Sequence, residues 1–222
     1  ALVQALLDAL DHHDTPVHPR TPIEAVEPSD EAPAVVTAEG ERIEGPSVVV
    51  AAGAWSRQIE GLDEGVRPPV RPVKGQILEL ESRPSFDLRH VLRGPDAYLV
   101  PKADGRLLVG ATSEEKGFET DATAGGLYEL LEGANEVVPG IRELTVRRSD
   151  VGLRPGTRDN APLLGPSGAP GVLYATGHYR HGILLTPVTA QEIARLVQSG
   201  TVSEWLEPFL PTRFANATPA AS

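Results

Sequence analysis

The spacing of apolar residues changes along the chain from a helical period to a strand-like one. Leu2, Leu6, Leu7 and Leu10 share one face at helical spacing and predict a helix over residues 1–13. The segments that follow are short and bounded by turn residues, which is typical of strands. We therefore expect strands at 21–26, 34–37, 41–44 and 47–52, with the last two forming a hairpin-like pair.

The run Val48-Val-Val-Ala-Ala52 is apolar at every position. Because side chains alternate between the two faces of a strand, this run predicts a central parallel strand that helices bury on both sides. Gly53 ends the strand, and residues 54–59 begin a helix. Such a strand is typical of a dinucleotide-binding sheet, in which ligands lie beyond the carboxyl ends of the strands.

The middle of the chain has a different pattern, because residues 76–81 alternate with period two. Glu79 and Glu81 share one face of that strand, opposite two leucines, and this indicates a solvated face rather than a catalytic pair. The other predicted elements are a hairpin of 98–101 with 106–111, a helix over 122–138, and a long strand over 141–153 that is broken at Gly152. They predict a mostly antiparallel sheet with one covering helix.

Residues 174–188, here called the hub segment, join a strand to a helix. A buried strand is expected over 171–176, then a tight turn at Gly177, then a helix that opens near Gly182 and ends at Gly200. Such a corner aims backbone N–H groups and the positive end of a helix dipole at one place. An ordinary strand-to-helix turn has the same pattern, so the segment indicates a ligand site only in combination with other features of the chain.

The predicted fold class is therefore α/β, or mixed α+β, with two domains. Residues 1–65 and 158–222 are expected to form one domain, with a tail from Ala215 onward. Residues 66–157 are expected to form the antiparallel domain inserted in it.

Composition excludes several classes of function. The formal net charge is −11 and there is no basic stripe, so nucleic acid is not an expected partner. The chain has no cysteine, which excludes disulfides, thiolate metal sites and cysteine nucleophiles. No apolar run approaches membrane length and no signal-peptide pattern is present, so we expect no membrane association and a cytoplasmic location. His178 and His181 have no third ligand at metal-binding spacing, so no metal site is expected.

Several motifs in chain order resemble one family of flavoenzymes. They are Val48-Val-Val-Ala-Ala-Gly-Ala-Trp-Ser56, Pro72-Val-Lys-Gly-Gln76, Tyr98-Leu-Val-Pro101, Gly152-Leu-Arg-Pro-Gly-Thr157 and Gly177-His-Tyr-Arg-His-Gly-Ile-Leu-Leu185. Together they resemble the FAD-dependent D-amino-acid oxidase superfamily, and within it the glycine oxidases of thiamine biosynthesis. The resemblance implies that the first domain is part of a Rossmann-like FAD-binding domain of the glutathione-reductase type, and that the second binds substrate.

The resemblance also implies roles for individual residues. Arg154 matches the arginine that grips the substrate carboxylate with its planar fork, and Tyr98 matches a tyrosine that adds a hydrogen bond. Arg180 matches an arginine that borders both flavin and substrate. The residues expected along the FAD are Ile23, Ala52, Gly53, His178, Tyr179, Arg180, His181, Gly182, Ile183 and Leu184.

The implied reaction is the oxidative deamination of glycine or a small amine acid. Hydride passes from the substrate Cα to flavin N5, O2 reoxidises the flavin with release of H2O2, and the imine hydrolyses in solution. Such chemistry needs an oriented substrate and a deprotonated amine more than a side-chain base. Because no cysteine is available for a thioether link, the FAD is expected to be bound non-covalently.

One part of the family pattern has no counterpart here. The G-x-G-x-x-G turn that holds the FAD pyrophosphate is absent, and the sequence contains no methionine. We therefore expect the chain to correspond to the C-terminal portion of such an enzyme. The alternative is a non-catalytic truncated fragment or interaction module that cannot hold FAD. In that case the strand at 48–52 would lack neighbours, and its exposed apolar surface makes a homo-oligomer possible.

Overall fold

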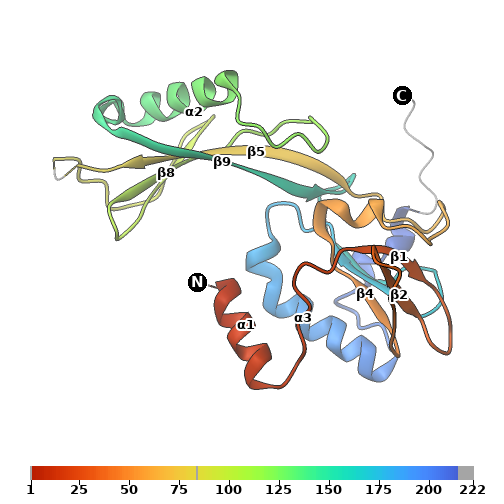
Figure 1. The fold of residues 1–222 in the computed structure, drawn as a ribbon. Coiled ribbons are helices and arrows are strands. Elements are labelled where there is room, and N and C mark those ends of the chain that lie inside the picture. Colours follow the sequence, from red (N-terminus) through yellow and green to blue (C-terminus); the bar gives the residue numbers. More distant parts are fainter. Residues whose placement is uncertain (1, 84, 215–222) are drawn as a thin grey trace.

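The computed structural model describes residues 2–83 and 85–214, so the predictions for Ala1 and for the tail 215–222 lie outside the described part. Helices and strands both contribute extensively, and the mixed α/β class is confirmed. Figure 1 shows a long sheet that extends to one side under α2, with two smaller sheets and α3 at its other end. None of the described helices combines the length and apolar character needed to cross a membrane.

The strands of the described residues form three sheets. The first has the order β1-β2-β3, the second β10-β11-β4, and the third β6-β7-β8-β5-β9. The strands are β1 Ile23–Glu27, β2 Ala34–Thr37, β3 Arg42–Glu44, β4 Val48–Val50, β5 Arg71–Glu81, β6 Leu92–Arg93, β7 Tyr98–Pro101, β8 Arg106–Gly110, β9 Thr145–Gly156, β10 Leu163–Pro166 and β11 Val172–Thr176. The helices are α1 Leu2–His12, α2 Ala124–Val137 and α3 Gly182–Ser199, with 3-10 helices η1 Gly53–Gln58, η2 Pro139–Glu143, η3 Glu207–Phe209 and η4 Pro211–Phe214.

The expected hairpin-like pair of residues 41–44 and 47–52 is wrong. Strand β3 pairs antiparallel with β2, whereas β4 pairs in parallel with β11, Val48 opposite Val172. The side chains explain the separation. All three residues of β3 are exposed, while β4 contributes Val48 and Val50 to a core that includes Tyr174.

Strand β4 is parallel, as predicted, but it is not buried on both faces. It stands at the edge of its three-stranded sheet, with β11 as its neighbour among the described residues. Val49 is 38% exposed and Ala51 is also exposed. The apolar run therefore buries one face here, and the other face is open to solvent.

The predicted break at Gly152 is also wrong. Strand β9 runs unbroken, and Gly152 lies directly opposite Gly75 of β5. Continuous pairing with β5 holds the strand together, and the irregularity lies instead between Glu79 and Leu80.

The prediction that Glu79 lies on a solvated face of β5 is wrong. Glu79 is buried and pairs with Arg106 and Arg148 at 3.1 and 3.4 Å.

The hairpin of β7 with β8, the helix α2 and the corner from β11 to α3 all form as expected. The core of the long sheet gathers Leu78 and Leu80 of β5 with Leu130 of α2. A separate core lies between β4, β11 and the first sheet. The first core lies within residues 66–157, but the second also includes Val66 and Val70 from that segment, and the division into two domains stays a prediction.

Candidate functional site

Arg154, near the end of β9, lies across the neighbouring strand β5. Its Nη1 donates to the carbonyl oxygen of Thr112 at 3.0 Å and approaches that of Lys74 at 3.4 Å. Gly75 leaves room for this crossing, because a Cβ at that position would come within 2.3 Å of the guanidinium. The two carbonyls and the glycine thus fix the guanidinium on one face of the sheet.

The charge of Arg154 is partly withdrawn from water. Burial lowers the pKa of its guanidinium, and the positive charge of Arg180 lowers it further, against the opposing influence of Tyr179 and Tyr98. The group still stays charged, because arginine does not lose its proton in proteins. Among the described residues no carboxylate oxygen lies within 4.0 Å of its nitrogens, so its neutral partners leave the positive charge to attract an anion.

Tyr98 is the first residue of β7, and its ring lies against Gly110 of β8. A Cβ added at Gly110 would lie 2.4 Å from the phenol oxygen, so only glycine accommodates the ring there. Tyr98 pairs with Gly110, two residues before Thr112, whose carbonyl accepts from Arg154. The predicted substrate residues Arg154 and Tyr98 therefore lie in adjoining parts of the long sheet, and the contact of Tyr179 with Pro155 brings the segment of Arg180 to them.

The hub segment reaches this group through Tyr179. Its backbone N–H donates to the carbonyl of Pro155 at 3.0 Å, which ties the segment to the residue after Arg154. The φ of Tyr179 is +49°, a strained value for a tyrosine. Its phenol lies 3.4 Å from the Ser113 hydroxyl, and that contact, with the nearby charges of Arg180 and Arg154, lowers the pKa of the phenol.

Arg180 is exposed and its guanidinium carbon lies 5.2 Å from the centre of the Tyr179 ring. His178 is half-buried, and burial lowers the pKa of its imidazole, whose Nε2 lies 3.0 Å from the Thr189 hydroxyl. His181 is exposed and directly precedes α3. Among the described residues, no cluster of three or more potential ligands could hold a metal.

The first turn of α3 presents backbone donors and apolar side chains together. In the described part of the chain, no backbone acceptor faces the N–H groups of Gly182, Ile183 and Leu184, as is usual for a first helical turn. Ile183 is 79% and Leu184 78% exposed. This turn can therefore offer both hydrogen bonds and apolar surface to a ligand.

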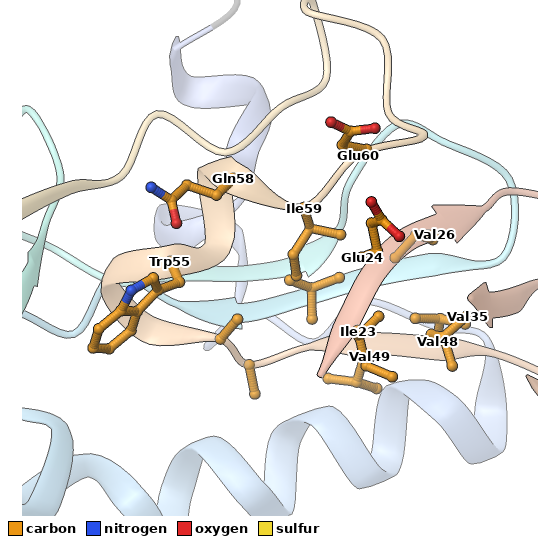
Figure 2. Close-up of a pocket in the computed structure, with 13 residues that line it drawn as sticks. Ile23, Glu24, Val26, Val35, Val48, Val49, Trp55, Gln58, Ile59 and Glu60 are labelled. Carbon is orange, nitrogen blue, oxygen red and sulfur yellow. The ribbon is translucent and has the colours of Figure 1, made fainter. Parts of the chain in front are cut away.

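The two earliest predicted cofactor residues, Ile23 and Ala52, line one pocket of about 520 Å³, here called the β4 pocket. In Figure 2 the side chains of Ile23 and Val49 lie together on its floor, with Trp55 at one end. The complete lining is Ile23, Glu24, Val26, Val35, Val48–Ala52, Trp55, Gln58, Ile59 and Glu60. Apolar walls with a few carboxylate and amide groups suit a flat aromatic group that carries hydroxyls.

Gly53 joins the β4 pocket to the hub segment. It has a φ of +55°, and its carbonyl accepts from the Ser56 hydroxyl at 2.8 Å and from the Thr176 hydroxyl at 3.2 Å. Thr176 is the last residue of β11, directly before Gly177. The pocket, the hub segment and Arg154 are therefore linked by short contacts, and the residues present fit the elongated cofactor that the sequence predicts.

Several contributing residues were not assigned from sequence. Gly75, Lys74 and Trp55 belong to motifs that carry the resemblance but had no predicted role, and Thr112 had none either. An isolated glycine inside a strand indicates close approach of another group, so Gly75 did carry a signal. The carbonyl of Thr112 and the tilted ring contact of Trp55 with Phe118, at 5.9 Å between ring centres, depend on tertiary contacts and gave no such signal.

The chain is similar to several known proteins. A family model described as FAD dependent oxidoreductase matches residues 1–196. The hydrogen cyanide synthase subunit HcnC of Pseudomonas aeruginosa is 39% identical over 169 residues, which are 76% of this chain and 40% of that protein. The bifunctional protein ThiO/ThiG of a Synechocystis species is 39% identical over 189 residues, 83% of this chain and 28% of that protein.

Among solved structures, the glycine oxidase of Geobacillus kaustophilus superposes with a TM-score of 0.77 at 34% identity, covering 87% of this chain and 52% of that one. The chain thus spans about half, or less, of the length of the proteins it matches. The resemblance to the D-amino-acid oxidase superfamily and to glycine oxidases is confirmed.

Proposed function

Because this chain belongs to the family of FAD-dependent oxidoreductases, we propose that it forms the substrate anchor and part of the flavin site for the oxidative deamination of glycine or another small amine acid. The observation that carries the proposal is the guanidinium of Arg154, held by the Thr112 carbonyl, with the segment of Tyr179 and Arg180 tied to the next residue, Pro155. The use of O2 and the place in thiamine biosynthesis rest on the resemblance, and these and the cytoplasmic location stay proposals.

The residues of the chain divide the work. Arg154 pairs with the substrate carboxylate through its planar fork, and the Tyr98 phenol donates a hydrogen bond to the same group. The tyrosines and arginines at the site offer donors and positive charge, so the site suits a substrate whose amine arrives deprotonated. FAD, when bound, supplies the hydride acceptor that O2 reoxidises with release of H2O2.

The assignment of the flavin is supported by two surfaces of the chain. The β4 pocket would hold one end of the FAD through Ile23, Ala52 and Gly53. The first turn of α3 would hold the ring system through the N–H groups of Gly182, Ile183 and Leu184, where the helix dipole favours an electron-rich group. His178, Tyr179, Arg180 and His181 would border the same group. Attachment would be non-covalent, because the chain has no cysteine to form a thioether.

Replacing the anchor tests the proposal. Arg154→Met keeps an apolar stem and removes the fork, so the dissociation constant of glycolate, a small carboxylate probe, should rise about 100-fold by calorimetry. Arg158→Met is the matched control, because Arg158 is exposed four residues further along the chain, and it should stay within about twofold of wild type.

The FAD-loaded protein should also release peroxide with glycine, and Arg154→Met should lose most of that activity at low glycine concentration. Equal affinity of wild type and Arg154→Met for glycolate would contradict the anchor. The absence of any flavin spectrum and of any peroxide with glycine, sarcosine or a D-amino acid would contradict the oxidase function.

A second function is favoured by α1. This helix buries none of its residues and leaves Val3 70% and Leu6 46% exposed. We propose, as the alternative, an interaction module that associates through this face without holding FAD. Sedimentation of the chain without FAD separates the two: association that Leu6→Glu abolishes supports the module, and a compact monomer argues against it.

A further inference from the structure

One face of β5 changes character along the strand. Leu78 and Leu80 face α2 and belong to the core of the long sheet. Alternate residues of a strand share a face, so Gln76 and Lys74, two and four residues before Leu78, lie on the same face. Both are 0% exposed. A fully buried ammonium is costly unless it is paired and hydrogen-bonded, so this end of the strand needs a dedicated set of partners.

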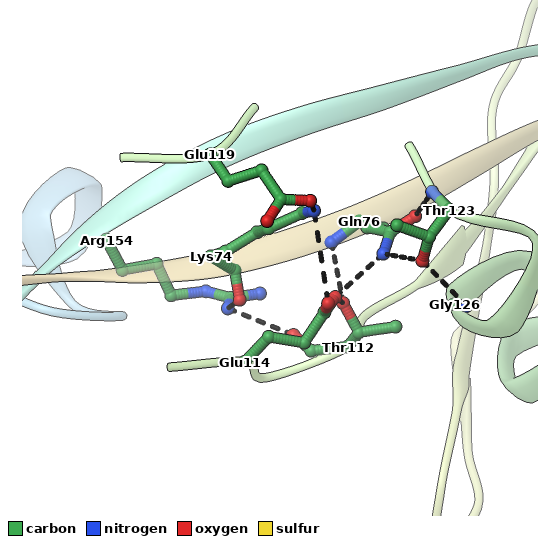
Figure 3. Close-up of polar contacts among 8 residues, drawn as sticks. All are labelled: Lys74, Gln76, Thr112, Glu114, Glu119, Thr123, Gly126 and Arg154. Atoms are coloured by element: carbon green, nitrogen blue, oxygen red, sulfur yellow. Dashed lines mark hydrogen bonds and ion pairs between the residues drawn. The ribbon is translucent and has the colours of Figure 1, made fainter. Parts of the chain in front are cut away.

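Those partners come from the segment between β8 and α2. Nζ of Lys74 lies 3.2 Å from a carboxylate oxygen of Glu119 and 4.0 Å from one of Glu114. The Gln76 amide donates to Glu114 at 2.8 Å and to the Thr123 hydroxyl at 3.0 Å, and its oxygen accepts from the Thr123 N–H at 2.9 Å. Figure 3 shows this network, with Arg154 beside it.

The network also keeps Glu114 ionised. Burial acts to raise the pKa of its carboxyl, but hydrogen bonds from Thr112 and Gln76 and the charges of Lys74 and Lys116 outweigh that effect and leave the pKa below its ordinary value. Lys74 and Glu114 therefore carry opposite charges, and their attraction holds the loop that carries Glu114 against β5.

Thr112 connects this network to the other face of the sheet. Its hydroxyl accepts from the Gln76 backbone N–H at 2.9 Å and donates to Glu114 at 2.6 Å, while its carbonyl accepts from Arg154 at 3.0 Å. The second carbonyl near Arg154 belongs to Lys74 itself, which also accepts from the Glu114 N–H at 2.9 Å. These additional hydrogen bonds of Thr112 and Lys74 thus fix the positions of both carbonyls that hold the guanidinium.

We propose that Lys74 and Gln76 are positioning residues for the substrate carboxylate: they fix the two carbonyls that aim the Arg154 guanidinium, without touching the substrate. This inference rests on the proposed function of Arg154 as the anchor. Aim matters because carboxylate and guanidinium form two parallel hydrogen bonds only in one relative orientation.

Removing the buried charge is the first test. Lys74→Met retains most of the stem but leaves Glu114 and Glu119 without their cation. The dissociation constant of glycolate should rise about tenfold, as expected when a buried polar partner is lost. In ¹H–¹⁵N spectra the Arg154 Nε–H resonance should broaden or shift. Lys102→Met is the control, because Lys102 is exposed in the turn between β7 and β8, and it should change neither readout.

A milder pair of variants serves if Lys74→Met does not fold. A Cβ at Gly126, in the first turn of α2, would lie 2.2 Å from the Gln76 amide nitrogen, whereas a Cβ at Gly125 would meet nothing within 4 Å. Both changes to alanine favour the helix equally. Gly126→Ala should weaken glycolate binding about threefold and shift the Arg154 resonance, and Gly125→Ala should do neither.

The outcomes separate the two proposals. Variants that lower the melting temperature while leaving both the glycolate affinity and the Arg154 resonance as in wild type would show a merely structural network and overturn the inference. If wild type itself does not bind glycolate, the anchor function fails, and the Arg154 resonance alone still decides whether Lys74 and Gln76 position the guanidinium.

Discussion

The surroundings of Arg154 and the β4 pocket differ in how far contacts within the chain fix and cover their side chains. At Arg154, carbonyls hold the guanidinium on one face of β5 and a buried network supports them from the other. Around the pocket and the first turn of α3, apolar side chains remain open, with Trp55 51% and Ile183 79% exposed. Contacts within the chain therefore fix the guanidinium of Arg154, whereas apolar side chains of the pocket and of the first turn of α3 remain exposed.

Strand neighbours account for the difference. Strand β5 is paired on both sides, with β8 and with β9, so side chains reaching over it meet a fixed surface. Strand β4 has β11 on one side and stands at the edge of its sheet within the described residues. A fixed surface favours precise recognition of a small charged group, and an open apolar wall favours a large flat one.

The largest effect is expected from a substitution that displaces the Arg154 guanidinium. In Gly75→Ala the new Cβ would need the space that the guanidinium occupies, 2.3 Å away, and displacing that group should weaken glycolate binding about 100-fold. Gly152→Ala, directly opposite on β9, meets nothing within 4 Å and is the matched control. Calorimetric titration measures both, and equal affinities would show that the site tolerates a mobile arginine.

An intermediate effect is expected on the open side. Ile183→Ser should raise the dissociation constant of FAD about tenfold, because the apolar atoms that serine lacks would give a ligand covering them about 1.4 kcal/mol. The melting temperature should hardly change, since the side chain is already exposed. Val197→Ser, 45% exposed near the other end of α3, should alter neither value. Quenching of FAD fluorescence measures affinity, and a large loss of stability instead would mean that Ile183 is packed.

The smallest effect concerns an ion pair between the loop after β9 and η4. Asp159, after β9, pairs with Arg213 of η4, and that hydrogen bond foremost lowers its pKa to about 2 from 3.8. Its folded pKa is depressed, so the stabilisation is complete above pH 3.8 and is lost as the pH falls toward about 2. Because Asp159 is 42% exposed, solvent screening reduces the contribution to about 1 kcal/mol.

Asp159→Asn should therefore be less stable than wild type at pH 6 and nearly equal to it near pH 2, as urea denaturation at several pH values would measure. Asp30→Asn, at an exposed aspartate, is the control and should show no such convergence. A deficit that persists unchanged at low pH would mean that the asparagine disturbs packing rather than an ion pair.

Local pattern was enough to predict most elements and to mark Arg154. Helical spacing and a closing glycine located α3, which ends at Gly200 with a φ of +67°. The alternation of β5 and the turn between β7 and β8 are equally local. The motif around Arg154 indicated the anchor by its resemblance, and the fold brings the strand of Tyr98 and the segment of Arg180 near it, while the anchor role itself stays a prediction. The cofactor roles along the hub segment stay predictions.

Pairing partners and buried polar contacts were decided by the tertiary structure. The apolar run of β4 indicated burial on both faces, but its exposure depends on which strands lie beside it, and that is not a local property. Likewise Lys74 looks like any strand lysine until the loop that carries Glu114 and Glu119 folds over it. Sequence determines what each short segment prefers, because backbone preference and periodicity are local. Only the fold decides which preferences are satisfied together, because a buried charge gains stability from groups that are distant along the chain.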